Sequence, residues 1–310
     1  MKKISIVIPC FNEEGNVKRI SEAVINIMSN SFSNYDYEVI FIDNDSKDNT
    51  RSIIKELCAN NKKIKAIFNI KNFGQFNSPY YGLLQSTGDA AILMACDFEE
   101  PVELIPKFIN AWEDGYKIAV GVKNKSHESF IIKKLKQFYY YLSKKYSSVD
   151  QIKMFTGFGL YDKDFLNILR KIDDPTPFFR GLVAEYGYKI KEFYFEQGYR
   201  TKGRSSNNFY SLYDGAMLSF TSYTKIGLRM ATFIGFIALA FSFLVSIVYL
   251  IMKLIWWDRF PAGMIPILLG MMFLGSVQIF FIGIIGEYIL SINTRVMKHP
   301  LVVEEERINF

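Results

Sequence analysis

Acidic residues follow a short apolar stretch in the first third of the chain. Residues 90–94 are uninterruptedly apolar, which is typical of a buried strand, and residues 95–101 then read Ala-Cys-Asp-Phe-Glu-Glu-Pro. Carboxylates placed where a buried strand emerges can hold a divalent metal ion against a phosphate group. The same carboxylates can also do no more than cap a following helix, whose amino-terminal end favours negative charge. This segment alone leaves both interpretations open.

Three further strand-like runs precede this segment, and polar residues follow each of them. The runs cover residues 4–9, 37–42 and 64–68, and two stretches with apolar residues at helical spacing, 17–29 and 50–59, separate them. Strands that alternate with helices predict an α/β fold with a mostly parallel sheet, and such sheets bind ligands beyond the carboxyl ends of their strands. We therefore expect one edge of the sheet to carry these polar residues: Asn12 and Glu13, Asp43 and Asp45, Asn69, Asn72 and Gly74, and Asp97 and Glu99.

Several other classes of protein fit this sequence poorly. No Gly-x-Gly-x-x-Gly follows the first strand and no Gly-Lys-Ser/Thr is present, which disfavours dinucleotide-dependent dehydrogenases and P-loop nucleoside triphosphatases. The three cysteines, Cys10, Cys58 and Cys96, lack paired metal-binding spacing, so we expect reduced, mostly buried thiols in a cytosolic compartment. The net charge of +6 is modest and accompanies no known nucleic-acid-binding module, so no nucleic-acid partner is predicted.

The last third of the chain carries two long apolar runs. Residues 230–252 contain no charged residue, and neither do residues 260–286. At about 1.5 Å per residue, each run is long enough to cross a hydrocarbon core of roughly 30 Å. We therefore predict two transmembrane helices, at about residues 230–253 and 262–289.

Basic residues flank the two apolar runs on one side. Lys225 and Arg229 precede the first run, and Arg295 and Lys298 follow the second. Because positively charged flanks remain in the cytoplasm, this asymmetry predicts that both termini and the domain before the membrane are cytoplasmic.

Five segments together resemble the family 2 glycosyltransferases with the GT-A fold. Residues 8–14 (Ile-Pro-Cys-Phe-Asn-Glu-Glu) are similar to the Pro-x-Tyr/Phe-Asn-Glu opening of that family, and residues 42–50 are similar to its Asp-Asp-Gly-Ser-x-Asp-x-Thr segment. Asn72-Phe73-Gly74 and Thr87-Gly88-Asp89 match two further landmarks. Residues 94–101 align with the Asp-x-Asp-Leu-Gln-Asp-Pro run of the polyprenyl-phosphate branch, which includes dolichol-phosphate mannose synthase and the bactoprenol glucosyltransferases. With both apolar runs, the resemblance covers almost the whole chain.

The resemblance implies a membrane-bound, inverting glycosyltransferase. Such an enzyme moves one sugar from a nucleotide sugar, in our prediction a UDP-sugar, to undecaprenyl (polyprenyl) phosphate for a cell-envelope glycan or O-antigen. It implies Asp97 and Glu99 as catalytic residues that hold Mg²⁺ or Mn²⁺. Lys123, Arg200 and Ser205 are then expected to bind the lipid phosphate. The residues expected around the nucleotide sugar are Pro9, Phe11, Glu13, Asp43, Asp45, Asn72, Gly74 and Cys96.

Two segments depart from the family pattern. Ala95 replaces the first aspartate of Asp-x-Asp, and Glu99 replaces the glutamine that follows. Mg²⁺ commonly binds through one or two carboxylates plus substrate phosphates, so Asp97 with Glu99 can still form a weaker site, and loss of metal dependence stays open. Residues 156–162 stand where relatives have Thr-Gly-Asp-Phe-Arg-Leu-Met-Asp, but they lack its internal aspartate and arginine. Asp162 is retained and can simply cap the following helix.

The implied organisation has four parts. They are a cytoplasmic catalytic domain (residues 1–205), an interfacial amphipathic segment (206–229), two transmembrane helices (230–290) and a cytoplasmic tail (291–310) that can form a strand between subunits. The resemblance further implies a protein of the bacterial inner (plasma) membrane that is a homo-oligomer, a tetramer in our prediction. A separate flippase and a downstream transferase are the implied partners.

Two alternatives to this enzyme differ in how well they fit the sequence. A catalytically inactive membrane scaffold of the same fold is supported by Ala95 and by the altered residues 156–162. A processive polysaccharide synthase is not favoured, because the sequence lacks the Gln-x-x-Arg-Trp element and the additional membrane spans of those enzymes.

Overall fold

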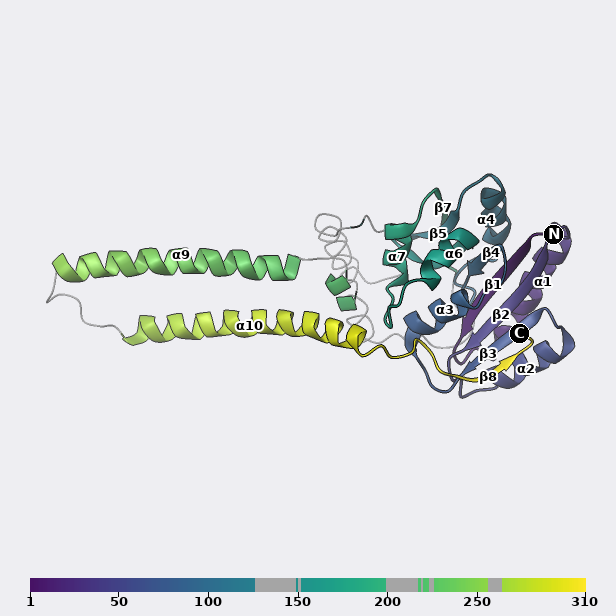
Figure 1. The fold of residues 1–310 in the computed structure, drawn as a ribbon, viewed down its shortest axis with the longest axis horizontal. Coiled ribbons are helices and arrows are strands. Elements are labelled where there is room, and N and C mark those ends of the chain that lie inside the picture. Colours follow the sequence, from purple (N-terminus) through teal and green to yellow (C-terminus); the bar gives the residue numbers. More distant parts are fainter. Residues whose placement is uncertain (126–148, 150–151, 199–216, 219, 223–225, 256–263) are drawn as a thin grey trace.

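The protein comprises an α/β domain and a pair of long helices that extend from it (Figure 1). The computed structural model describes residues 1–125, 149, 152–198, 217–218, 220–222, 226–255 and 264–310. Within these residues, eight strands form one sheet in the order β7-β5-β6-β4-β1-β2-β3-β8. The strands are β1 (Lys3–Cys10), β2 (Asp36–Asp43), β3 (Ile64–Asn69), β4 (Ala90–Leu93), β5 (Ile118–Lys125), β6 (Phe155–Asp162), β7 (Ile190–Glu196) and β8 (Glu304–Ile308). The helices are α1 (Val17–Ser31), α2 (Thr50–Asn60), α3 (Gly74–Leu84), α4 (Leu104–Glu113), α6 (Lys163–Arg170), α7 (Phe179–Tyr186), α9 (Ile226–Ile255) and α10 (Met264–Val296).

The sheet is mostly parallel, as the sequence predicts. β1 pairs in parallel with both β2 and β4, and β3 pairs in parallel with β2. β6 runs antiparallel between β4 and β5, and β8 runs antiparallel along β3 at the edge of the sheet. The strand order reverses between β1 and β4, and such a reversal opens a crevice beyond the carboxyl ends of the strands.

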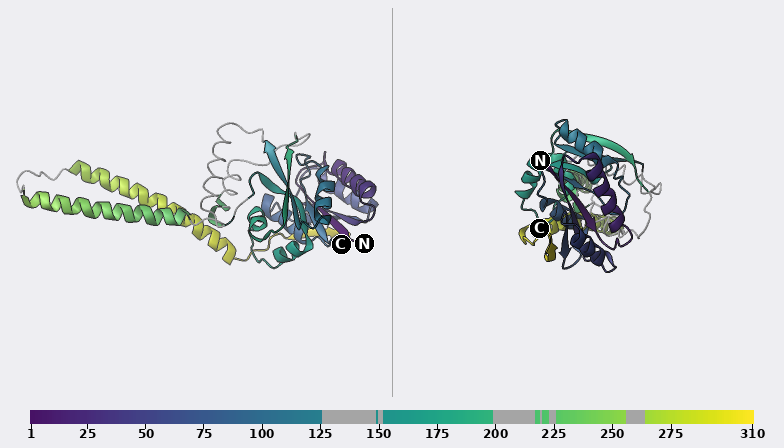
Figure 2. Two further views of the ribbon diagram at one scale, coloured as in Figure 1. Left: turned by 90° about the horizontal axis from the view of Figure 1, so that it is seen from above. Right: turned by 90° about the vertical axis from the view of Figure 1, so that its right-hand side faces the viewer.

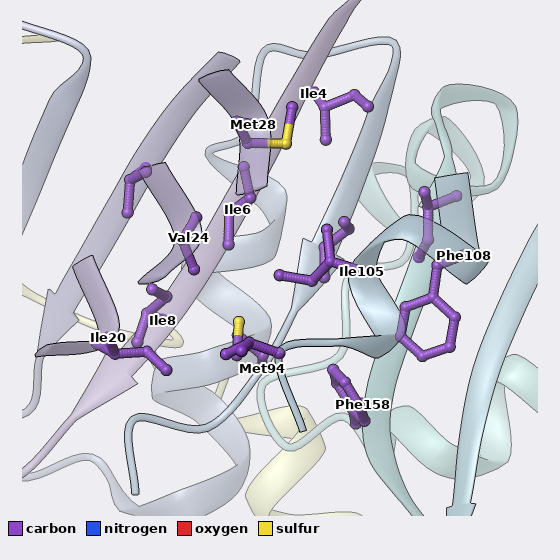
Figure 3. Close-up of a cluster of buried hydrophobic side chains, with 14 of the residues drawn as sticks. Ile4, Ile6, Ile8, Ile20, Val24, Met28, Met94, Ile105, Phe108 and Phe158 are labelled. Atoms are coloured by element: carbon purple, nitrogen blue, oxygen red, sulfur yellow. The ribbon is translucent and has the colours of Figure 1, made fainter. Parts of the chain in front are cut away.

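Helices cover both faces of the sheet, so its central strands are apolar on both sides. On one face, Ile4, Ile6 and Ile8 of β1 pack against α1, α2 and α4 (Figure 3). On the other face, Val7 of β1 lies in a cluster with residues of α3, α6 and α7. A continuous run of β-branched residues in β1 is explained by this burial on two sides.

The acidic segment after β4 does not cap a helix. Helix α4 begins at Leu104, and its N-cap residue Glu103 makes no side-chain capping hydrogen bond. Residues 97–100 instead lie in the turn between β4 and α4. The capping interpretation of Asp97, Glu99 and Glu100 is therefore wrong.

A buried glutamate ties together the amino-terminal ends of the parallel strands. Glu38 is 1% exposed and pairs with the Nζ atoms of Lys3 and Lys65, each at 2.8 Å. It also accepts hydrogen bonds from Ser5 Oγ at 2.5 Å and from Thr87 N and Oγ1, each at 2.9 Å. Burial alone would raise the pKa of Glu38, but the lysines and the other donors lower it to about 2. This carboxylate is fully partnered and stabilises the sheet.

Gly88 explains why the Thr87-Gly88-Asp89 segment occurs at this edge. A Cβ atom at Gly88 would lie 2.8 Å from backbone atoms of Lys3, Ser5 and Ala90, so no larger residue fits. The Asp89 carboxylate accepts a hydrogen bond from the backbone N–H of Lys3 at 3.0 Å. The segment therefore joins β1 to β4 at the edge opposite the carboxyl ends of the strands.

Helices α9 and α10 contain 30 and 33 residues, lie side by side and point away from the α/β domain (Figure 2). Among the described residues, one stretch, Phe273–Val296 in α10, is long and apolar enough to cross a membrane, and none of it is buried. Both predicted helices form, but the structure supports a membrane crossing for α10 alone, and a crossing by α9 stays a prediction. The predicted interfacial segment, residues 206–229, lies largely outside the described residues.

Ion pairs fasten the end of α10 to the α/β domain. Arg295 Nε lies 3.4 Å from Asp174 Oδ2, and Arg295 Nη2 donates to Ser222 Oγ at 2.7 Å. Lys298 Nζ lies 3.2 Å from Asp173 Oδ2. The chain then forms the tail strand expected from the sequence, β8, which pairs here with β3 of the same chain.

Candidate active site

The carboxyl ends of the parallel strands meet at one edge of the sheet. β1 to β4 are mutually parallel, and β5 runs in their direction because β6 is antiparallel to both β4 and β5. β7 is parallel to β5 and therefore ends at the same edge. In the described part of the chain, the predicted site residues at or just after the carboxyl ends of these strands are Phe11, Glu13, Asp43, Asp45, Asn72, Gly74, Asp97, Glu99 and Lys123.

Hydrogen bonds join the loops that follow β1 and β2. The N–H of Asn12 donates to Ser46 Oγ at 2.8 Å, and Asn12 Oδ1 accepts from the N–H of Lys47 at 2.7 Å. The N–H of Glu13 donates to Thr50 Oγ1 at 2.8 Å. Two loops that are distant in sequence thus form one wall of the site. Pro9 and Phe11, which the sequence also assigns to this wall, are half-buried.

At this edge, Asn12, Asp45 and Phe98 have left-handed backbone conformations, as does Met154 directly before β6. Their φ angles are 55° at Asn12, 67° at Asp45 and 61° at Phe98. Asparagine and aspartate tolerate this region, whereas an aromatic residue there is strained. Backbone strain persists where surrounding contacts enforce it, and it concentrates at functional sites. Phe98 lies between Asp97 and Glu99, so the strain is located in the acidic segment.

Asp43, the last residue of β2, is fully buried and only partly satisfied. Its Oδ2 atom accepts a hydrogen bond from the N–H of Ser46 at 3.2 Å and lies 3.1 Å from Arg51 Nε. Its Oδ1 atom is buried and has no hydrogen-bond partner among the described residues. Burial raises the pKa of Asp43, although Ser46 and Arg51 oppose this shift. A buried acceptor without a donor is costly, so Oδ1 is suited to receive a donor from a ligand.

Asn44 organises the loops that follow β2 and β3. Its Nδ2 atom donates to Asn72 Oδ1 at 2.8 Å, and its Oδ1 atom accepts from Asn69 Nδ2 at 3.1 Å and from the N–H of Phe73 at 2.9 Å. Asn72 Oδ1 also accepts from the N–H of Gly74 at 2.8 Å. Gly74 has φ of 84°, a conformation that favours glycine. Asn72 and Gly74 thus lie beside Asp43, and Asn44 is a positioning residue that the sequence analysis missed.

Glu99 is paired with a lysine from another strand. Lys123 Nζ, at the end of β5, lies 3.7 Å from Glu99 Oε2, and the same oxygen accepts a hydrogen bond from Gln197 Nε2 after β7. The neighbouring Asp97 accepts a hydrogen bond from the N–H of Glu99 through Oδ1 at 3.1 Å. The Lys123 side chain, which is 14% exposed, therefore lies next to the acidic segment that follows β4.

Glu100 is a buried carboxyl group that the sequence analysis did not assign to the site. It accepts hydrogen bonds from the N–H of Ala95 and from Thr156 Oγ1, each at 2.8 Å. Burial raises the pKa of Glu100 to about 7, against the lowering effect of these two hydrogen bonds. The Glu100 side chain thus links the turn after β4 to the start of β6. Only its place in the acidic run could have indicated this.

The oxygen donors at this edge fit a divalent ion through one main carboxylate. Among the described residues, no three His, Cys, Asp or Glu side chains are placed to share a metal ion. Mg²⁺ does not need such a group when substrate phosphates and waters complete its shell. Asp97 is half-buried and suits this role, whereas Glu99 would have to exchange Lys123 for the ion.

Other residues singled out in the sequence lie elsewhere. Asp162 lies at the opposite edge, where it caps α6 by accepting from the N–H of Asp164 at 2.9 Å. This confirms the capping interpretation of Asp162. Cys96 is a free thiol buried in the core near Cys10, so a ligand would meet its backbone. Arg200 and Ser205 lie outside the described residues.

Comparisons with known proteins agree with this architecture. Residues 5–187 match the family described as Glycosyl transferase family 2. The chain is 33% identical over 300 residues to the putative glycosyltransferase CsbB of Bacillus subtilis, a match that covers 96% of this chain and 89% of that protein. It is 28% identical over 306 residues to the bactoprenol glucosyl transferase of Shigella phage SfX, covering 98% of this chain and 99% of that protein.

The fold also resembles solved structures. Glucosyl-3-phosphoglycerate synthase from Mycobacterium tuberculosis in complex with Mg²⁺ and uridine-diphosphate superposes with a TM-score of 0.50 at 12% sequence identity. That match covers 71% of this chain and 77% of the synthase. At such low identity the likeness concerns the fold alone, which is the GT-A-like arrangement expected from the sequence.

Proposed function

The chain belongs to glycosyl transferase family 2, and we propose that it transfers one sugar from a UDP-sugar to undecaprenyl phosphate at the cytoplasmic face of a bacterial plasma membrane. One observation carries this proposal. Asp43, with a buried oxygen that has no donor among the described residues, shares a sheet edge with the carboxylate of Asp97 and the cation of Lys123. This edge can therefore receive a nucleoside, a diphosphate and a second phosphate.

The nucleotide sugar occupies the wall formed by the loops after β1, β2 and β3. Asp43 Oδ1 accepts a hydrogen bond from the base, and the loops that carry Asp45 and Asn72 surround the nucleoside. Pro9, Phe11, Glu13, Gly74 and the backbone of Cys96 complete this half of the site. Relatives named bactoprenol glucosyl transferase support a glucosyl donor class.

A divalent ion, Mg²⁺ or Mn²⁺, is held mainly by Asp97, with Glu99 as its second candidate ligand. When bound, such an ion neutralises the charge that develops on the leaving diphosphate. The position of the Asp97 carboxylate is fixed by the turn that it forms with Phe98, whose φ is positive, and with Glu99, whose N–H donates to Asp97 Oδ1.

The site has to position the acceptor phosphate more than it has to deprotonate it. A phosphate monoester has a second pKa near 6 and is already anionic at neutral pH. Lys123, with Arg200 and Ser205, holds this phosphate so that its oxygen attacks the anomeric carbon and the bond to the leaving UDP breaks. A single displacement inverts the anomeric centre. Residues 156–162 can therefore lack the internal aspartate of the family without loss of the reaction.

The two long helices bring this site to the lipid. We propose that α9 crosses the membrane together with α10, that residues 206–229 lie at the interface, and that both termini are cytoplasmic. The ion pairs of Arg295 and Lys298 with Asp174 and Asp173 support the orientation, because they hold the basic end of α10 at the catalytic domain. The catalytic domain then comprises residues 1–205, and strand β8 (Glu304–Ile308) of the cytoplasmic tail, residues 291–310, adds to its sheet.

A homo-oligomer, in the form of a tetramer, is part of the proposal. The tail strand β8 adds to an exposed sheet edge, and the same edge of a neighbouring subunit could receive it. A separate flippase and a downstream transferase would use the lipid-linked sugar. An inactive scaffold is not favoured, because Asp43, Asp97 and Lys123 are assembled at one edge.

The decisive test is an assay of the purified protein in detergent. Undecaprenyl phosphate is incubated with a panel of radiolabelled UDP-sugars, in Mg²⁺, in Mn²⁺ or in EDTA. One labelled lipid product that EDTA abolishes would support the donor, the acceptor and the metal together. A product that persists in EDTA would contradict the metal role, and a folded protein that labels no lipid with any donor would contradict the proposed reaction.

A further inference from the structure

We propose that the carboxy-terminal strand β8 completes the nucleotide site through Arg51, a positioning residue that bridges Glu305 of β8 and Asp43 of β2. The inference rests on the proposed function, in which Asp43 binds the nucleotide. It states in addition that binding of the nucleotide sugar depends on strand β8, which follows helix α10 in the chain.

Strand β8 is held firmly against the donor half of the sheet. It pairs with β3 from Ala66↔Ile308 to Asn69↔Glu304. Asn309 Nδ2 donates to the carbonyl oxygens of Cys58 and Ile64, each at 2.8 Å. The strand therefore forms the edge of the sheet beside β3, one strand away from β2, which ends in Asp43.

Arg51 connects this strand to the site with two different nitrogen atoms. Its Nη2 atom lies 2.6 Å from Glu305 Oε2, and its Nε atom lies 3.1 Å from Asp43 Oδ2. Nη2 also donates to the carbonyl oxygen of Asn69 at 3.4 Å, and the guanidinium lies 5.1 Å from the centre of the Phe68 ring. The contact with Glu305 is a hydrogen bond, whereas the contact with Asp43 is an ion pair in which the Nε–H has no acceptor among the described residues. The extended guanidinium thus reaches both carboxylates at once, which the single ammonium group of a lysine does less well.

The place of Arg51 in its helix supports a role outside the helix. It is the second residue of α2, and the positive amino-terminal end of a helix disfavours a cation. Two carboxylates, one from β2 and one from β8, offset this cost. The arginine is thus explained by Asp43 and Glu305, and not by helix formation.

These contacts fix the orientation of the Asp43 carboxylate. The N–H of Ser46 donates to Oδ2, and Arg51 Nε forms an ion pair with the same oxygen at 3.1 Å without hydrogen-bond geometry; among the described residues Oδ1 has no donor. Arg51 also opposes the rise in the pKa of Asp43 that burial causes, so it favours the ionised acceptor. When Glu305 is lost, Arg51 loses the carboxylate that holds its outer end, and Asp43 is held less firmly.

The neighbouring ion pair provides a matched control. Glu306 of β8 lies 2.5 Å from Lys55, one helical turn further along α2. The exposed fractions of these two carboxylates are similar, 54% for Glu305 and 43% for Glu306. Both pairs join β8 to α2, but Lys55 is further from the end of α2 that faces Asp43.

The test is a calorimetric titration of the full-length protein in detergent with UDP. We expect Glu305→Gln to weaken UDP binding about threefold, because an exposed ion pair contributes modestly. Arg51→Lys should weaken binding roughly tenfold, because lysine cannot bridge both carboxylates. Glu306→Gln should bind UDP like the wild type. In steady-state assays, Glu305→Gln should raise the KM for the UDP-sugar and leave kcat and the KM for the lipid unchanged.

Wild-type UDP affinity in Glu305→Gln would overturn the inference. Equal weakening of UDP binding in Glu305→Gln and Glu306→Gln would also overturn it, because it would indicate only that β8 is loosened. A lower kcat with unchanged UDP affinity would overturn it as well. If the wild type binds UDP but labels no lipid, the proposed acceptor reaction fails while the UDP titrations still decide the role of Arg51. A wild type that binds no UDP would remove both proposals.

Discussion

Buried carboxylates lie at both edges of the sheet, and their surroundings differ. At the amino-terminal edge, Glu38 pairs with two lysines and accepts further hydrogen bonds, and its pKa is lowered to about 2. At the carboxyl edge, Asp43 is equally buried, burial raises its pKa, and one of its oxygens has no donor in the part of the chain that the structure describes. Glu100, at the same edge, has a pKa raised to about 7 by burial.

The difference separates stability from function. A buried charge that has all its partners costs the fold little and stabilises the elements that it joins, whereas an incomplete one is a cost that a ligand can relieve. Left-handed backbone occurs at both edges, at Lys189 before β7 and, beside the incompletely partnered carboxylate of the carboxyl edge, at Asn12, Asp45 and Phe98. Changes at this edge should therefore lower activity more than stability, and changes at the amino-terminal edge should do the reverse.

The largest effect is expected from Asp97→Asn. If Asp97 is the main metal ligand, as proposed, its loss should lower kcat at least about a hundredfold, because charge on the leaving diphosphate would no longer be neutralised. Sugar transfer to undecaprenyl phosphate measures it, with Glu22→Gln, an exposed carboxylate of α1, as the control. Wild-type activity in Asp97→Asn would show that the metal role has been assigned to the wrong residue.

The second largest effect should appear in stability. Glu38→Gln leaves Lys3 and Lys65 without their buried carboxylate, and should lower the free energy of unfolding by about 2–3 kcal/mol. Thermal unfolding in detergent measures this, while the KM values of the folded protein should not change. Asp36→Asn is the control. Asp36 is on the same strand as Glu38 and also pairs with a lysine, Lys63, but its side chain is 45% exposed. A large shift in KM for Glu38→Gln would break the separation between the two edges.

The Glu38 contribution should also depend on pH. Its pKa is about 2 in the folded state against an ordinary value of 4.5, so the unfolded chain binds more protons between these values. The stabilisation is complete above pH 4.5 and is lost as the pH falls toward 2. Glu38→Gln should have a flatter stability profile over this range. An identical profile for the two proteins would assign the acid sensitivity to other groups.

A smaller effect on the other edge is expected from Asp43→Asn. The amide cannot supply a charged acceptor to the base, so the Kd for UDP should rise about tenfold. Its thermal stability should fall less than that of Glu38→Gln, because Asp43 is already incompletely partnered. A fall in stability as large as that of Glu38→Gln, with unchanged UDP affinity, would mean that Asp43 is a structural residue.

The sequence predicts those parts of the molecule that depend on local patterns. The expected strand at residues 37–42 is β2 (Asp36–Asp43), and the expected helix at 17–29 is α1 (Val17–Ser31). Parallel strands place their carboxyl ends together, so the position of Asp43 and Asp97 at one edge also follows from the pattern.

Contacts between distant strands could not be predicted in this way. Glu100 bonds to Thr156, Lys123 pairs with Glu99, and Arg51 pairs with Glu305. Periodicity describes which face of an element is buried, but it does not specify which strands become neighbours. For Thr87-Gly88-Asp89 the sequence identifies the segment but not its role. The structure shows that Gly88 packs closely against the backbone of β1, away from the site.

The smallest predicted effect concerns Lys123, whose ion pair with Glu99 has two explanations. If Lys123 binds the lipid phosphate, Lys123→Met should raise the KM for undecaprenyl phosphate about fivefold and leave the KM for the donor unchanged, while Lys123→Arg retains most of the affinity. Lys107→Met, on the outer face of α4, is the control. Glu99→Gln then separates the two explanations. When the lysine is freed from Glu99 for the phosphate, the KM for the lipid should fall, and this gain should vanish in the double variant with Lys123→Met. If Glu99→Gln instead raises that KM as Lys123→Met does, the pair acts as a unit that shapes the turn after β4, and the acceptor phosphate must be bound by other residues.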